Sequence, residues 1–127
     1  MLKDKAYYNA LTDAIAGCAY HVGDVLGTGF LEKVYENAMA IELANAGLSY
    51  TSQQPLHVYF KDQIVGDYFA DFVVEGDIIL ELKAVRAIEK IHFAQCQNYL
   101  KATGIKLGLL INFGEEKVRI RRVANGI

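Results

Sequence analysis

The chain has 127 residues, of which 53% are hydrophobic and 22% are charged, and its net charge at pH 7 is −2. This length suits one ordinary domain over residues 1–127, and the composition excludes a disordered tail. No apolar run approaches the roughly 20 residues that cross a bilayer, and the first residues lack a signal-peptide pattern, so we expect a cytoplasmic protein.

Two amphipathic helices are predicted in the first third of the chain. Apolar side chains recur with the helical period over residues 7–22, and Gly23 follows as the expected C-cap. After a loop at residues 23–29, a second helix is predicted over residues 30–46, and Gly47 ends it. Its expected apolar stripe consists of Leu31, Val34, Ala38, Ile41 and Leu43 or Ala44.

The remainder of the chain alternates strand and helix patterns. Strands are predicted over residues 56–60, 64–74, 78–83, 107–113 and 118–123, and a helix over residues 87–103. Pro55, the only proline, stands where the first strand is expected to begin. The order α-α-β-β-β-α-β-β indicates an α/β fold of the α+β type, with a mixed central sheet flanked by helices.

Two cysteines, Cys18 and Cys96, fall inside predicted helices. They lack metal-ligand spacing and are too few for a disulfide scaffold. Buried, reduced thiols are therefore expected, because free cysteine behaves as a small apolar residue.

Charged residues interrupt an otherwise apolar strand at residues 78–85. Because strand side chains alternate between faces, Glu81 and Lys83 share one face. Leu80 and Leu82 share the other. Placing an anion and a cation in a core strand is costly unless they are paired or bind a metal. Such a pair is either a structural ion pair at a sheet end or part of a functional site.

The register of the preceding strand decides whether Asp71 meets Glu81. A two-residue loop at residues 76–77 would place Asp71 opposite Leu82, so that the two acids project from different faces and no metal site forms. A three-residue loop at residues 75–77 pairs Asp71 directly with Glu81. We favour the three-residue loop, or a bulge with the same effect.

Two neighbouring carboxylates beside a lysine suit Mg²⁺ or Mn²⁺, which are hard cations that take oxygen ligands. The implied chemistry is phosphodiester hydrolysis, in which the metal polarises the phosphate and lowers the pKa of a bound water. Lys83 would orient that water or help to take its proton.

Two helices carry further candidate residues. Glu32 and Tyr35 are i, i+3 neighbours on the second helix, and His92, Gln95 and Tyr99 form one stripe of the third. Taken alone, Glu32 is better explained by the favourable interaction of an acid with a helix N-terminus. Taken alone, the stripe on the third helix is better explained as an ordinary exposed face.

Taken together, these motifs resemble the GxxExxY protein family, which is placed in the PD-(D/E)XK nuclease superfamily. The resemblance extends from about residue 11 to residue 123. It rests on Gly29, Glu32 and Tyr35, and on the runs at residues 69–74, 79–84, 92–100 and 108–114. It implies a restriction-endonuclease-like α-β-β-β-α-β core with an additional N-terminal helix.

The resemblance also implies a metal site. Asp71 and Glu81 would bind the metal, and the Leu82 carbonyl would add a third oxygen. Lys83 would position or activate the water, and Glu32 would reach the metal site from its helix, either directly or through water. The superfamily's nominal proline before the first acid is absent, because Ala70 stands there.

Further residues are implied to support the site and the substrate. Gln95 and Tyr99 match the Q-x-x-x-Y feature of the RecB-like branch, in which they support the site and the substrate backbone. Tyr35, Tyr99 and His92 are the candidate substrate contacts.

The distribution of charge is uneven along the chain. Residues 1–82 carry four Lys or Arg and 12 Asp or Glu, whereas residues 83–127 carry nine and three. The basic part either faces phosphates or is a solvated basic surface.

The leading hypothesis is therefore a Mg²⁺-dependent nuclease acting on nucleic acid, with DNA favoured over RNA. The small size suggests a homodimer, a partner, or a preference for ends, flaps or single strands. The alternative is a catalytically silent module that binds nucleic acid or protein on the same fold.

Overall fold

The computed structural model describes residues 2–126 and contains three helices and five strands in that range. In chain order these are α1 (Lys5–Leu26), α2 (Glu32–Asn45), β1 (Tyr50–Phe60), β2 (Gln63–Val74), β3 (Ile78–Lys83), α3 (Lys90–Thr103), β4 (Leu107–Asn112) and β5 (Arg119–Ala124). The predicted order of helices and strands is confirmed, and β3 has the predicted bounds.

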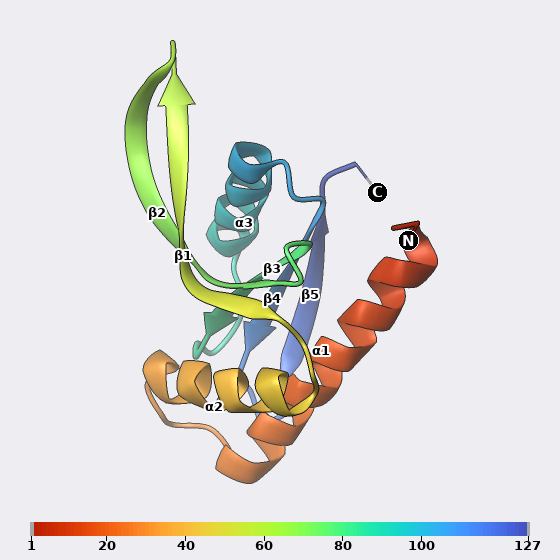
Figure 1. Ribbon diagram of the computed structural model, residues 1–127. Helices are drawn as coiled ribbons and strands as arrows, with labels where there is room; N and C mark the ends of the chain where they lie inside the picture. Colours follow the sequence, from red (N-terminus) through yellow and green to blue (C-terminus); the bar gives the residue numbers. More distant parts are fainter. Residues whose placement is uncertain (1, 127) are drawn as a thin grey trace.

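The strands form one mixed sheet in the order β1-β2-β3-β4-β5. β3 and β4 run parallel, and the other neighbouring strands run antiparallel. Helices α1 and α2 pack on one face of this sheet, and α3 packs on the other (Figure 1). The structure thus confirms a mixed sheet flanked by helices.

Helix α1 is longer than predicted. It continues through Gly23 to Leu26, and Gly27 closes it by donating its N–H to the Gly23 carbonyl at 2.8 Å. Gly23 therefore does not cap the helix. A Cβ at this position would lie 2.2 Å from a methyl group of Val118, so glycine allows the helix to approach the chain before β5.

Helix α2 buries a different face from the predicted one. Its buried residues are Tyr35, Met39 and Leu43, which are spaced at i, i+4. The predicted stripe was wrong for Leu31, Val34 and Ile41, whose side chains are exposed. Two apolar rows compete on this helix, and the row that contains Tyr35 faces the sheet because the Tyr35 ring stacks on Phe113.

Strands β1 and β2 form a long hairpin that rises beyond the rest of the sheet (Figure 1). Its tip is a two-residue turn in which Lys61 and Asp62 both have positive φ, as in a type I′ turn. We predicted Pro55 at the start of β1, but it lies inside the strand. An edge strand tolerates this proline because one side of its backbone needs no partner.

Both cysteines are buried, as expected, and burial raises the pKa of the Cys96 thiol to about 12.

No helix within residues 2–126 is long and apolar enough to span a bilayer.

Candidate metal and catalytic site

The turn between β2 and β3 sets the register that the metal site requires. Val74 pairs with Ile78, so the loop consists of Glu75, Gly76 and Asp77. The three-residue loop is thus confirmed. The ladder ends at Phe72 and Leu80, and one further step along it brings Asp71 opposite Glu81.

Two hydrogen bonds hold the carboxylates of Asp71 and Glu81 at the edge of this ladder. The Asp71 backbone N–H donates to Glu81 Oε2 at 3.1 Å. The Leu82 backbone N–H donates to Asp71 Oδ2 at 2.8 Å. Each carboxylate is therefore held by the backbone beside the other acid, and the two acids form one site.

Glu81 sits in surroundings that disfavour its negative charge. Its side chain is only 6% exposed. Burial, and then the neighbouring Asp71 carboxylate, raise the pKa of Glu81 to about 8, although Lys83 acts in the opposite direction. A divalent cation would relieve this repulsion, so the two acids fit a metal such as Mg²⁺ in charge and donor type.

The protein supplies only part of a coordination shell. Within residues 2–126, no group of three or more His, Cys, Asp or Glu side chains is placed to hold a metal ion. The Asp71–Glu81 pair would have to be completed by backbone oxygen and water. Mg²⁺ commonly accepts this arrangement, because it keeps several of its waters in proteins.

Lys83 ends β3 on the same face as Glu81. It is half-buried, and no ion pair within residues 2–126 involves it. Its carbonyl accepts the Phe113 backbone N–H at 2.8 Å. The lysine is thus anchored through its backbone, and its ammonium group has no carboxylate partner within the described chain.

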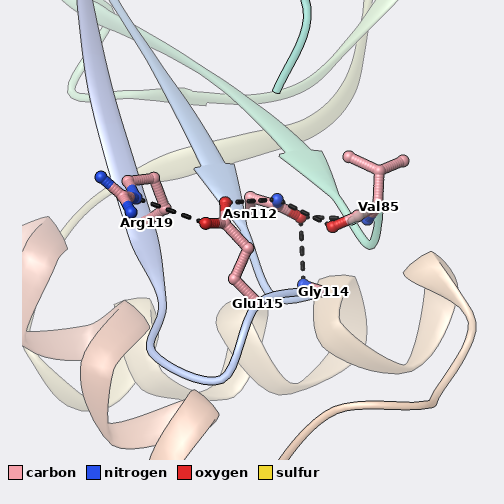
Figure 2. A network of polar contacts seen from close by, with 5 residues as sticks. All are labelled: Val85, Asn112, Gly114, Glu115 and Arg119. Carbon is pink, nitrogen blue, oxygen red and sulfur yellow. Dashed lines mark hydrogen bonds and ion pairs between the residues drawn. The ribbon is translucent and has the colours of Figure 1, made fainter. Parts of the chain in front are cut away.

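Asn112 fixes the segment that follows Lys83 (Figure 2). The Asn112 side chain is fully buried and brackets Val85, accepting its N–H at 3.0 Å and donating to its carbonyl at 2.9 Å. Its amide also donates to Glu115 at 2.8 Å, and its oxygen accepts the Gly114 N–H at 3.0 Å. This one side chain ties together the ends of β3 and β4.

The basic strand β5 continues the same row of residues. Lys83 pairs with Asn112, and Asn112 pairs with Arg119, so these three side chains share a face of the sheet. Arg119 forms an ion pair with Glu115 at 3.4 Å (Figure 2). The basic C-terminal part therefore places cationic groups at the end of the sheet where Lys83 lies.

Helix α2 reaches the acids through a residue that the sequence did not single out. Gln53 donates to Glu36 at 2.8 Å and to Asp71 Oδ1 at 3.3 Å. Glu32, one turn earlier, is exposed, and no hydrogen bond or ion pair in residues 2–126 joins it to Asp71 or Glu81. Glu36, and not Glu32, is therefore the α2 acid that hydrogen bonds link to Asp71, through Gln53.

Tyr35 is fully buried, which leaves it no surface for a substrate. Its hydroxyl donates to the Gly27 carbonyl at 2.6 Å and accepts the Phe30 N–H at 3.3 Å. Its ring stacks on Phe113 with 4.6 Å between centroids. Tyr35 thus fixes the loop between α1 and α2 against the chain after β4.

Helix α3 contributes a linked pair beside the acids. Gln95 donates to the Tyr99 hydroxyl at 3.0 Å. Burial, followed by the charges of Glu81 and nearby acidic and tyrosine groups, raises the pKa of Tyr99 to about 12. His92 instead accepts the Glu89 backbone N–H at 2.9 Å and so caps the start of α3.

Comparisons with known proteins bear on the fold and the family. No match is found among curated proteins. The fold is similar to that of an alkaline exonuclease, LHK-Exo, from Laribacter hongkongensis, at 13% identity and a TM-score of 0.55, over 98% of this chain and 72% of that one. It is also similar to the crystal structure of SSO0001, at 14% identity and a TM-score of 0.54, over 76% of this chain.

This chain spans about half of SSO0001, since the match covers 51% of it. At these identities the two structures establish the fold alone. The sequence pattern of the PD-(D/E)XK nuclease superfamily matches residues 9–123, which includes every strand of the sheet down to Val123. The chain therefore belongs to the PD-(D/E)XK nuclease superfamily.

Proposed function

We propose that the protein is a divalent-metal-dependent nuclease that hydrolyses phosphodiester bonds of nucleic acid. The observation that carries this proposal is the Asp71–Glu81 pair, with Lys83 on the same strand face. A buried glutamate beside a second, half-buried carboxylate is unfavourable for stability, and metal binding is a function that accounts for it.

The roles follow from position. Asp71 and Glu81 hold Mg²⁺ or Mn²⁺, and the Leu82 carbonyl adds a third oxygen. When bound, the metal supplies Lewis-acid polarisation of the phosphate and a more acidic water. Lys83 orients the attacking water by donating a hydrogen bond to it, which suits an ammonium group that forms no ion pair within residues 2–126.

The helices support these residues. Gln95 and Tyr99 position the acids and the substrate backbone from α3. Glu36 restrains Asp71 through Gln53, whereas Glu32 would approach the metal only through water. His92 positions the start of α3 through its capping contact. Tyr35 positions the loop before α2 through its hydrogen bonds to Gly27 and Phe30.

Several finer assignments belong to the same proposal. We place the chain in the GxxExxY branch, because Gly29, Glu32 and Tyr35 carry that motif. DNA is the preferred substrate over RNA, and the cytoplasm is the expected compartment. A homodimer would give so short a chain more surface with which to grip a substrate.

A thermal-shift series tests the metal site. Mn²⁺ or Mg²⁺ should raise the melting temperature of the wild type, because a ligand that binds only the folded state stabilises it. Asp71→Asn should abolish this shift, whereas Asp62→Asn, which changes an exposed acid in the hairpin turn, should leave it unchanged. An identical shift in all three proteins would contradict the metal assignment.

Cleavage of a panel of DNA and RNA substrates tests the activity. Wild type should cleave in the presence of Mg²⁺, and Glu81→Ala and Lys83→Ala should each lose at least about 100-fold, the scale of an effect on the chemical step. Equal cleavage by all three would identify a contaminant. Metal-dependent stabilisation without cleavage of any substrate would favour the silent binding module.

A further inference from the structure

A groove separates the β1–β2 hairpin from α3. Its volume is about 740 Å³, which lies within the range of pockets that hold small organic ligands. The hairpin wall is formed by His57, Val58, Tyr59 and Tyr68. The helix wall includes Gln95, Asn98, Tyr99 and Lys101. We call this feature the hairpin groove.

The hairpin groove adjoins the part of the sheet that carries the two candidate metal-binding acids. Gln95 and Tyr99 line it and are hydrogen-bonded to each other. Tyr99 also packs in the buried apolar cluster that contains Ala70, the neighbour of Asp71 on β2, and Ile79, which shares a face of β3 with Glu81. A molecule lying in the groove would therefore extend from the site where hydrolysis is proposed.

One wall of the groove offers an aromatic surface. Tyr68 is 44% exposed, and its ring lies 5.5 Å from that of Tyr99 at a tilt of 49°. Gly66 makes space for this ring, because a Cβ there would come within 3.1 Å of it. A half-exposed aromatic ring held beside a second one is a platform on which a planar base can stack.

The helix wall supplies the polar groups that a nucleotide needs. Gln95, Asn98 and Lys101 recur at spacings of three on α3 and so share one side of the helix. The Asn98 amide is exposed and presents both a donor and an acceptor to a base edge. Lys101 is an exposed cation that suits a phosphate.

We propose that the hairpin groove binds one or two unpaired nucleotides of the substrate strand, adjacent to the bond that is cleaved. The base stacks on Tyr68, and Lys101 meets the phosphate. The pocket's size and its one-sided aromatic wall favour a single strand over a duplex, whose bases are already stacked. This inference rests on the proposed nuclease function and adds the substrate class to it.

Fluorescence polarisation in the absence of divalent metal tests the groove without any cleavage. A labelled single-stranded oligonucleotide and a blunt duplex of the same sequence are the probes. Tyr68→Ala should weaken binding of the single strand about tenfold and Tyr68→Phe should restore it, because stacking needs the ring and not the hydroxyl. Lys101→Ala should reduce the salt dependence of binding by about one phosphate contact.

Phe69→Ala is the matched control, because Phe69 is the next residue on the strand, is 56% exposed and does not line the groove. It should bind the single strand as the wild type does. Equal losses in Tyr68→Ala and Phe69→Ala, or no loss in Tyr68→Ala, would overturn the proposal. A wild-type protein that does not bind single strands would also overturn it. So would sedimentation data showing that Tyr68→Ala changes only the oligomeric state.

The two proposals fail separately. Binding that depends on Tyr68, combined with no cleavage of any substrate, leaves the groove standing and refutes the nuclease activity. Cleavage that depends on Glu81, combined with single-strand binding that is indifferent to Tyr68, refutes the groove alone.

Discussion

The two faces of the sheet differ in what they bury. The face under α1 and α2 is filled by apolar side chains from both helices and from the sheet, among them Ile15, Met39, Leu80 and Leu109. The face under α3 has a smaller apolar cluster, and its polar residues include Glu81 and Asn112, both buried.

The larger apolar cluster and the candidate site therefore lie on opposite faces of the sheet. A continuous apolar layer can stabilise the sheet from one side, while the other side carries charges that are costly to bury. β3 serves both faces at once, because Leu80 and Leu82 point into the larger cluster and Glu81 points away from it. A single strand thereby anchors the candidate site residues to the larger apolar cluster.

The largest expected effect is on the apolar face. Met39→Ala should lower the free energy of unfolding by about 2–5 kcal/mol, because it leaves a cavity at a fully buried position. Ile41→Ala changes an apolar residue of the same helix that is 64% exposed, and should cost no more than about 0.5 kcal/mol. Urea denaturation measures both. Equal losses would mean that α2 packs through the face that the sequence first suggested.

Asn112→Ala should have the next largest effect, at the polar end of the other face. It removes four hydrogen bonds and leaves the Val85 and Gly114 N–H groups without their partner, which should cost about 2–3 kcal/mol. Asn37→Ala, at an exposed position of α2, is the control and should be nearly neutral. A neutral Asn112→Ala would show that the clamp after Lys83 is dispensable.

Sequence reasoning recovered the elements wherever local patterns are decisive. Strand β3 was predicted with its bounds, because an apolar run stands directly after the turn at residues 75–77. It failed on α2, where two apolar rows are available and only contact with Phe113 selects between them. It also ended α1 at Gly23, since the close approach of Val118 cannot be read from local sequence.

The same limit applies to the site. The shared face of Glu81 and Lys83 follows from strand alternation, and the pairing of Asp71 with Glu81 follows from one loop length. Gln53 and Glu36 were missed because their contacts join residues far apart in the chain. Asn112 carried a usable signal, being one polar residue in an otherwise fully apolar strand.

Glu81→Gln should raise the free energy of unfolding, by less than Met39→Ala and Asn112→Ala lower it. The amide keeps an oxygen that can accept the Asp71 N–H. It also removes a carboxyl group whose pKa rises from 4.5 to about 8 on folding, so folding at neutral pH no longer requires the uptake of a proton. The metal-free variant should therefore gain about 1 kcal/mol in unfolding free energy while losing its response to Mn²⁺. Glu116→Gln, at an exposed position between β4 and β5, should change neither quantity. A destabilised, metal-free Glu81→Gln protein would argue that the acid pair supports the fold itself.

The smallest effect concerns the contact between α1 and the turn that sets the register. Tyr7 donates its hydroxyl to Asp77, and this hydrogen bond, aided by burial, raises the Tyr7 pKa from 10.0 to about 12. A pKa that is raised on folding contributes stability that is fully present below the unfolded pKa of 10.0 and is lost as the pH rises to about 12. Tyr7→Phe should therefore lose less stability than the wild type across this window, when unfolding is followed by urea titration at each pH. Tyr20→Phe, at an exposed position of the same helix, should follow the wild-type curve, and a Tyr7→Phe curve parallel to both would contradict a stabilising link between α1 and Asp77.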